Sequence, residues 1–261
     1  ELIGTLNTVI FCPEDLQLIK GTPSGRRRFL DMEISQTSAT YYHQLMQYNR
    51  LLQQRNAVLK EYRGKNTIPL EEWDLQLADM ASFIVKKRLE SLKKINLLID
   101  LMNRKLTGGL ENLTIGYEQP YMDNGSLEYT KEGFYERIKA ALPQDRHRLS
   151  TSVGPHRDDL RFFSDAMDLK KFGSQGQQRT AVLSLKLSEL EFIKSEVGEY
   201  PVLLLDDVLS ELDESRRVNL LQFIHKRIQT FITTTDIHDF KDLKSVQFIS
   251  CEGGKVQYGQ P

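Results

Sequence analysis

The stretch Tyr200-Pro201-Val202-Leu203-Leu204-Leu205-Asp206-Asp207 decides the fold of this chain. Its apolar run, Val202 to Leu205, ends at two adjacent carboxylates. A run that short and that uniformly apolar predicts a strand buried on both faces of a parallel sheet. Ligands bind at the carboxyl ends of such strands in α/β proteins. Asp206 and Asp207 therefore predict a polar site at the edge of an α/β sheet.

The two carboxylates suit phosphate chemistry. One acid is a usual partner of Mg²⁺, which keeps waters and takes one or two carboxylates together with phosphate oxygens. The other acid is then available to orient or deprotonate a water, as at the end of a Walker B strand in a phosphate-handling ATPase. An apolar strand followed by acids is also common without any nucleotide site, so the interpretation depends on two further segments.

The first of these is the stretch from Lys171 to Thr180, where two glycines flank a serine ahead of a helix expected from Gln175 to Glu196. Its apolar residues predict a broad buried stripe; they are Val182, Leu183, Leu185, Leu187, Leu190 and Ile193. The unpaired N–H groups at the start of a helix, the hydroxyl of Ser174 and a glycine that permits close approach suit an anion such as a terminal phosphate. The alternative is that Ser174 simply caps the helix.

The second segment follows the acids. Ser210-Glu211-Leu212-Asp213 precedes a helix of about four turns, expected from Glu214 to Arg227. Asp213 is of the residue type that caps a helix amino terminus, and capping alone would explain it.

Taken in order, these three segments resemble the signature motif, the Walker B strand and the D-loop of ABC-type ATPases. The chain is most similar to one group within that class, the RecF family of bacterial recombination mediators. The resemblance runs from the first residues to about Asp236, and it rests on Phe172-Gly173-Ser174-Gln175-Gly176-Gln177-Gln178-Arg179-Thr180, Leu203-Leu204-Leu205-Asp206-Asp207-Val208-Leu209-Ser210-Glu211-Leu212-Asp213, Pro13-Glu14-Asp15-Leu16, Arg26-Arg27-Arg28-Phe29-Leu30-Asp31-Met32-Glu33 and Gly154-Pro155-His156-Arg157-Asp158-Asp159.

The resemblance implies a set of roles with ATP and Mg²⁺ as cofactors. Asp206 would help to hold Mg²⁺ through water, and Asp207 would stand where most ABC ATPases have the glutamate that polarises the attacking water. Signature residues would contact ATP held by a second subunit, and D-loop residues would lie at the same interface. The signature set is Ser174, Gly176 and Gln177, and the D-loop set is Ser210 and Asp213.

The resemblance also implies partners. It predicts an ATP-dependent homodimer that binds single- and double-stranded DNA at gaps and helps RecA to load, together with RecO and RecR. Hydrolysis would be slow and would release the dimer. No residue in the sequence identifies the DNA-binding surface.

Three family features are altered or missing. The 261 residues contain no Gly-x-x-x-x-Gly-Lys-Ser/Thr phosphate loop. Because the resemblance places that loop ahead of the first residue here, we expect this chain to be the carboxyl-terminal two thirds of such a protein and to be inactive as an ATPase by itself. The histidine expected after the next strand is replaced by Thr235, with His238 too far along, and no Q-loop glutamine is evident near Phe11 to Glu14.

Composition narrows the class without identifying it. The chain is 27% charged and 39% hydrophobic with a formal net charge of −1, so bulk charge gives no argument for nucleic-acid binding. Basic residues occur in clusters along the chain, and such clusters usually form solvated surface. Cys12 and Cys251 are far apart and have no neighbouring ligand residues, which favours a reducing cytoplasm over a disulfide scaffold or a zinc site. No run is long enough to span a membrane.

Spacing along the rest of the chain predicts an antiparallel helical hairpin. Residues 41–62 follow a heptad seam, and residues 70–106 form a second long helix ended by Gly108-Gly109, with a breaker from Gly64 to Pro69 between them. The seam contains one charged misfit, Arg55. Further elements are expected at 113–117 (strand), 131–142 (helix), 160–163 with 167–169 (hairpin), 230–234 (buried strand) and 246–258 (closing hairpin).

The predicted fold class is therefore α/β, an ABC-type ATPase head. Residues 1–30 and 195–261 would form an incomplete lobe I, and residues 31–194 an inserted helical lobe II that holds the hairpin and the signature helix. The alternative function is a non-catalytic interaction fragment that docks partners without binding ATP. An ABC transporter ATPase is disfavoured by the long helical arm and by Thr235.

Overall fold

A three-stranded parallel sheet carries the two adjacent aspartates. The structure is a computed structural model that describes residues 5–63, 69–109, 111–121, 129–235, 240 and 246–259. Strand β5 (Val202–Asp206) lies between β1 (Thr8–Phe11) and β6 (Thr230–Thr233), parallel to both. The register places Asp206 beside Thr233. The prediction of a parallel strand ending at the acids is confirmed.

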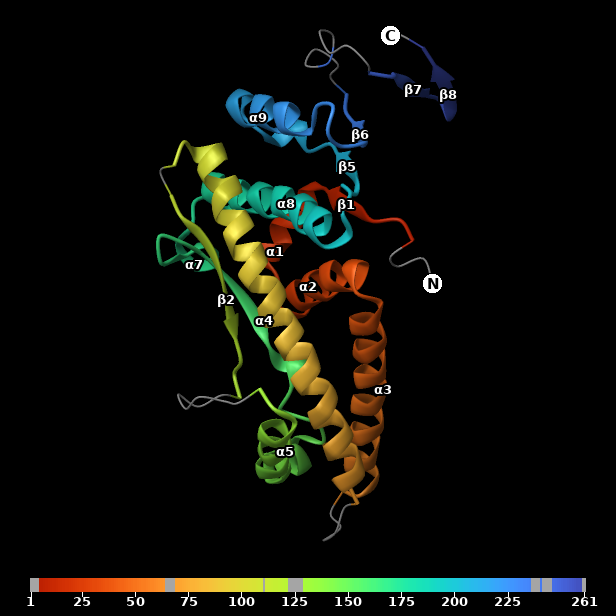
Figure 1. The fold of residues 1–261 in the computed structure, drawn as a ribbon, viewed down its shortest axis with the longest axis vertical. Helices are drawn as coiled ribbons and strands as arrows, with labels where there is room; N and C mark the ends of the chain where they lie inside the picture. Colours follow the sequence, from red (N-terminus) through yellow and green to blue (C-terminus); the bar gives the residue numbers. More distant parts are fainter. Residues whose placement is uncertain are drawn as a thin grey trace.

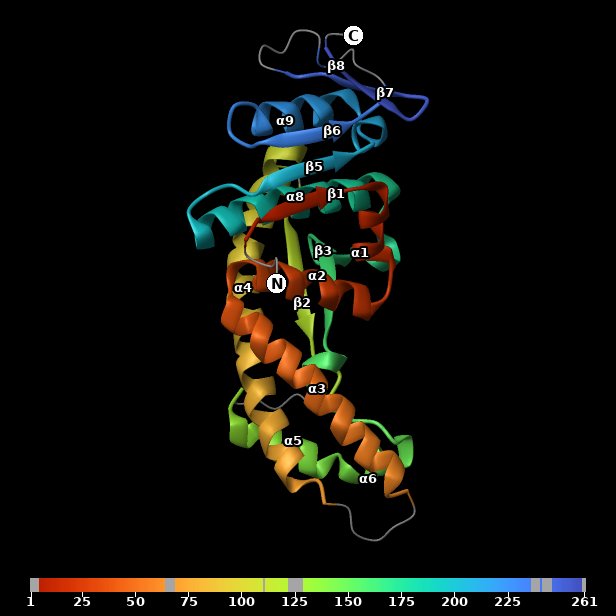
Figure 2. The same cartoon turned by 90° about the vertical axis from the view of Figure 1, so that its right-hand side faces the viewer.

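Helices cover one face of this sheet, and in the described part of the chain the other face is exposed. Figures 1 and 2 show α8 (Gln175–Val197) and α9 (Glu214–Ile224) on the same face. Ile10 of β1 and Phe231 of β6, which flank Leu204 in register, are 51% and 53% exposed. The prediction that β5 is buried on both faces, and that β6 is buried, was wrong. Both errors have one cause, which is that helices cover a single face of the described sheet.

The helix after the acids is shorter than expected. It ends at Ile224 rather than at Arg227. Lys226 has a φ of 57°, in the left-handed region that a right-handed helix cannot include. The backbone leaves the helical conformation at His225, whose ψ is 127°, and changes hand at Lys226, so α9 ends after about three turns.

The predicted helical hairpin forms the arm of the molecule. Helix α3 (Ala39–Glu61) runs away from the parallel sheet and α4 (Glu71–Thr107) returns toward it (Figure 1). Ser38 caps α3 by accepting from the N–H of Tyr41, and α4 ends at Gly108 with φ 71°, as its sequence predicts. Most of the breaker segment, residues 64–68, lies outside the described residues.

A second, antiparallel sheet lies beside the arm. It has the order β2 (Leu113–Glu118), β3 (Asp159–Ser164), β4 (Met167–Asp168), which confirms the predicted strand and hairpin. The helix expected over 131–142 divides into α5 (Lys131–Ala140) and α6 (Leu142–Arg148), because Pro143 has no N–H to continue α5. The remaining elements are η1 (Pro13–Leu16), α1 (Gln17–Lys20), α2 (Pro23–Thr37), η2 (Pro155–Arg157), α7 (Leu169–Phe172), η3 (Leu209–Glu211), β7 (Ile249–Glu252) and β8 (Lys255–Tyr258).

The chain leaves the parallel sheet after β1 and returns to it only at β5. The arm and the antiparallel sheet are therefore an insertion between two neighbouring strands. The expected division at residues 30/31 and 194/195 stays a prediction; those positions fall inside α2 and α8. No helix in the described ranges combines the length and the apolar character needed to cross a membrane.

A cluster of acids and one lysine lies where η1, α2 and α8 meet. Lys186 Nζ lies 3.3 Å from Asp15 Oδ1 and 3.4 Å from Glu189 Oε2. Glu33 is 4% exposed, and its Oε2 has no hydrogen-bond partner within the described part of the chain. Burial raises the pKa of Glu33 to about 7; Lys186 opposes this shift and Asp15 adds to it. The positive charge of Lys186 therefore interacts with three carboxyl groups, those of Asp15, Glu33 and Glu189.

Replacing Glu33 by Gln should change how stability depends on pH. The folded protein keeps a proton on Glu33 between its ordinary pKa of 4.5 and about 7, where the unfolded chain releases it. Stability from this group is therefore fully present below pH 4.5 and is lost as the pH rises through 7. The free energy of unfolding of E33Q, relative to the unsubstituted chain, should rise by up to about 3 kcal/mol between pH 4.5 and 8.

Urea unfolding at several pH values measures this difference. The exposed Glu136→Gln is the matched control and should show no such trend. A difference between E33Q and the unsubstituted chain that stays flat across this range would mean that Glu33 titrates normally.

Candidate nucleotide site

A threonine joins the two acids at the carboxyl edge of the parallel sheet. The hydroxyl of Thr233 donates to Asp206 Oδ1 over 2.6 Å. The N–H of Asp207 donates to Thr233 Oγ1 over 3.0 Å. Sequence reasoning missed Thr233, although it is the β6 residue beside the first acid in a parallel register. These bonds fix the Asp206 carboxylate and the Asp207 backbone with respect to each other.

Asp207 has an unusual backbone conformation. Its φ is 51°, in the left-handed region, and its carbonyl accepts from the hydroxyl of Ser210 over 2.7 Å. An L-residue other than glycine reaches this region at a cost of about 1 kcal/mol, and aspartate tolerates it better than most. Within the described part of the chain, the Asp207 carboxylate has no hydrogen bond or ion pair. The turn therefore presents this carboxylate to solvent beside Asp206.

The donor set at this edge fits a magnesium ion. Asp206 keeps its second oxygen available while Oδ1 is bonded to Thr233. Carboxylate oxygens at an exposed sheet edge, with room for water, are the ligands that Mg²⁺ takes together with phosphate. The residues present could therefore hold the ion directly or through water.

Ser174 begins α8 and caps it. Its hydroxyl accepts from the N–H of Gln177 over 3.2 Å, and the Gln177 side-chain oxygen accepts from the N–H of Ser174 over 3.0 Å. The amide nitrogen of Gln177 donates to Glu111 over 3.1 Å. The capping alternative raised from the sequence is confirmed, and Ser174 and Gly176 remain exposed at the helix amino terminus.

The turn into α8 needs a glycine for space. A Cβ on Gly173 would lie 2.6 Å from the carbonyl oxygen of Leu169. This tight approach brings α7 to the start of α8 and leaves Phe172 70% exposed beside Ser174. An exposed aromatic ring and the start of a 23-residue helix therefore share one surface.

The D-loop residues lie on either side of Leu212. Asp213 caps α9 by accepting from the N–H of Arg216 over 2.9 Å and also pairs with its guanidinium. Asp206, Asp207, Ser210 and Thr233 thus form one hydrogen-bonded group, and Ser174 and Gln177 form another with Glu111. Among the described residues, no hydrogen bond or ion pair joins the two groups.

Among the described residues, the structure identifies no replacement for the missing histidine or for the missing Q-loop glutamine. Thr235 is exposed after β6, and His238 lies outside the described residues. Near the expected Q-loop, the N–H of Cys12 donates to Asp15 over 2.9 Å and Glu14 lies in η1. Cys12 and Cys251 are free thiols.

The fold is that of an α/β ABC-type ATPase head with a helical insertion. No protein-family model matches the chain. Curated relatives do match it, and they are named DNA replication and repair protein RecF. The relative from Alkaliphilus oremlandii is 50% identical over 94% of this chain and 67% of its own length. A second, from Clostridium botulinum strain Eklund 17B, is 47% identical over 97% of this chain and 70% of its own length.

Solved structures agree with the sequence relatives. A structure titled as the recombination mediator protein RecF with ATP in the RecFOR pathway matches with a TM-score of 0.89 and 37% identity, over 100% of this chain and 69% of that one. A second RecF structure, with an ATP analogue, matches with a TM-score of 0.87. This chain belongs to the RecF family.

Proposed function

We propose that this chain is the ATP-dependent, DNA-binding part of a DNA replication and repair protein. The observation that carries the proposal is the pairing of two acids at a parallel sheet edge with a serine-glycine helix start, in a chain whose structural relatives were solved with ATP. Each group alone is common. Together they are the two halves of a nucleotide site that closes between subunits.

ATP-driven dimerisation would bring the two groups together across a subunit interface. Ser174, Gly176 and Gln177 would meet ATP held by a second subunit, where the start of α8 favours negative charge. Ser210 and Asp213 would lie at the same interface.

Hydrolysis is assigned to the sheet edge. Asp206 would hold Mg²⁺ through a water, and a bound Mg²⁺ would neutralise charge on the transferred phosphate. Asp207 would orient and deprotonate the attacking water. Because aspartate is one methylene shorter than glutamate, we infer slow turnover that times the release of the dimer.

The direct test replaces Asp207 by Asn in a chimera. The chimera joins the part of the Alkaliphilus oremlandii relative that this chain does not match to this chain. Single-turnover hydrolysis of pre-bound ATP should fall roughly 100-fold or more, with ATP affinity retained, because only the base is lost. Glu214→Gln, an exposed acid in the first turn of α9, is the control. Unchanged turnover in D207N would remove Asp207 from the role of base.

The biological setting is proposed from the family. Binding of single- and double-stranded DNA at gaps, cooperation with RecO and RecR, RecA loading and a cytoplasmic location belong together in this proposal. The names of the curated relatives and the RecFOR pathway of the solved structures support it.

The second candidate is a non-catalytic interaction fragment. The apolar row of exposed Ile10, half-buried Leu204 and exposed Phe231 favours it, because apolar surface on an uncovered sheet face is typical of a protein-binding site. Titrating ATP·Mg²⁺ into this chain and into the chimera separates the candidates. Binding by the chimera supports the nucleotide site, whereas a chimera that folds without binding ATP favours the fragment.

A further inference from the structure

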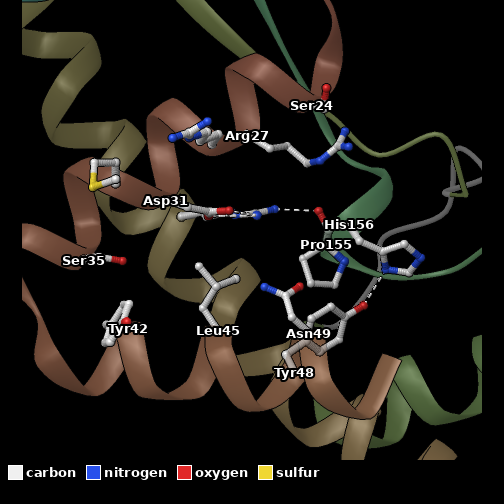
Figure 3. Close-up of a pocket in the computed structure, with 13 residues that line it drawn as sticks. Ser24, Arg27, Asp31, Ser35, Tyr42, Leu45, Tyr48, Asn49, Pro155 and His156 are labelled. Carbon is white, nitrogen blue, oxygen red and sulfur yellow. Dashed lines mark hydrogen bonds and ion pairs between the residues drawn. The ribbon is translucent and has the colours of Figure 1, made fainter. Parts of the chain in front are cut away.

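A pocket of about 400 Å³ lies in the angle between α2 and α3, away from both groups of the nucleotide site. We call it the elbow pocket. Figure 3 shows Ser24, Arg27 and Asp31 of α2 on one side and Tyr42, Leu45 and Asn49 of α3 on the other. The residues that line it are Ser24, Arg27, Arg28, Asp31, Met32, Ser35, Tyr42, Leu45, Tyr48, Asn49, Arg88, Pro155 and His156.

The charge of the elbow pocket is positive. Its one carboxylate, Asp31, is fully engaged, since both of its oxygens accept from Arg88 at 2.9 Å and one also accepts from Tyr41. Arg27 donates to a backbone carbonyl, that of Asp158, over 2.7 Å. Within the described part of the chain, neither Arg27 nor Arg28 pairs with a carboxylate. Two guanidinium groups therefore face the pocket without a direct carboxylate contact, and Asp158, Asp159 and Asp31 act on Arg27 only through longer-range attraction.

The histidine of the pocket adds no charge. Its Nε2 donates to the Thr151 carbonyl and its Nδ1 accepts from the Tyr48 hydroxyl over 2.6 Å. Burial lowers the pKa of His156 to about 4, so the ring is neutral at pH 7. Burial, and then the charge of Arg88, also lowers the pKa of Arg27. A bound anion would relieve this repulsion between Arg27 and Arg88.

Unused polar groups face the same space beside an apolar wall. In the described residues, no hydrogen bond is made by the side chains of Ser35, Tyr42 or Asn49. The ring of Tyr42 and the side chain of Leu45 supply apolar surface next to them. Donors without acceptors suit a phosphate, and a tyrosine ring beside them suits a sugar or a base.

We propose that the elbow pocket binds one nucleotide unit of a nucleic-acid strand, with its phosphate at Arg27 and Arg28 and its sugar or base against Tyr42. This inference rests on the proposed DNA-binding function and names a contact surface for it. It ties the strand to the base of the arm, where α2 and α3 meet.

Fluorescence anisotropy of a labelled ten-nucleotide oligodeoxythymidylate with this chain, without ATP, tests the inference. The double variant R27Q/R28Q should bind at least 10-fold more weakly. The slope of log affinity against log salt should also become shallower by about 1.4, which is 0.7 for each of two lost phosphate contacts. Tyr42→Ala should weaken binding at least 5-fold without changing that slope.

The control K105Q/K131Q removes the same charge from exposed sites outside the pocket and should have little effect. Equal losses in both double variants would overturn the elbow pocket as the site. If the chain bound thymidine monophosphate but not the oligonucleotide, the proposal that the pocket binds a nucleic-acid strand would be wrong. It would also be wrong if the chain bound neither of them. Because these titrations contain no ATP, failure of the proposed dimerisation would leave their result unchanged.

Discussion

Replacing Arg55 by Met should cost about 3–5 kcal/mol of folding free energy, because it leaves two buried carboxylates without their cation. The side chain of Arg55 is 0% exposed. It donates to Asp74 over 2.6 Å and to Asp145 over 2.7 Å, and also to the hydroxyl of Thr151. These contacts hold α3, α4 and α6 together far along the arm. Methionine fills similar space but makes none of these bonds.

Urea unfolding measures this loss. The exposed Arg50→Met on the same helix is the matched control and should change stability by no more than about 0.5 kcal/mol. Adding Asp74→Asn and Asp145→Asn to Arg55→Met should recover part of the loss, because the uncharged amides are cheaper to bury. A loss below 1 kcal/mol for the single variant would show that water reaches these carboxylates.

Replacing Gly154 by Ala should cost about 3 kcal/mol or more. Gly154 has a φ of 131°, where a residue with a Cβ is strained. The added Cβ would lie 2.3 Å from the Tyr48 hydroxyl and 3.2 Å from His156 Nδ1, inside the hydrogen bond that joins them. Strain and overpacking therefore act at one position.

Gly25→Ala supplies a control of opposite sign. Gly25 lies in α2 with its nearest neighbouring atom 4.0 Å from the added Cβ, so alanine should stabilise the helix by about 0.5–1 kcal/mol. Thermal unfolding of both variants makes the comparison. A Gly154→Ala protein as stable as the parent chain would mean that Tyr48 and His156 can move apart without cost.

The regular parts of the fold could be predicted because their patterns are local. The heptad seam located α3, and Gly108 located the end of α4. The seam's misfit, Arg55, could be noticed but not explained, since its partner Asp145 lies 90 residues away. Pro143 was a local signal for the break between α5 and α6 that the helical pattern obscured.

The site residues also differ in whether a local sequence pattern could predict them. Asp206 and Asp207 could be placed at a strand end from sequence, but Thr233 joins them only through the register of β6. The stretches beginning at Arg26 and at Gly154 were noticed through family resemblance, and the first also as a cluster of basic residues. The structure supplies their physical reason: Arg26 pairs with Asp159 at 2.7 and 2.8 Å, and Arg88 donates to the carbonyl of Pro155.

The roles assigned to the signature residues belong to an arrangement of two subunits. The hydrogen bonds of Ser174 and Gln177 explain how α8 begins, and the same bonds would exist in a helix with no nucleotide partner. A measurement on two subunits distinguishes a Ser174 that only caps α8 from a Ser174 that also contacts ATP.

The most direct measurement is the mass of the chimera by light scattering, with and without ATP·Mg²⁺, for the parent and for Ser174→Arg. The account predicts that the parent becomes a dimer with ATP, and that S174R stays a monomer while it still binds ATP. Ser195→Arg, at the far end of the same helix, should dimerise normally, and Ser174→Ala separates loss of the cap from added bulk. An S174R protein that dimerises with ATP like the parent would contradict the closure of the site by a second subunit.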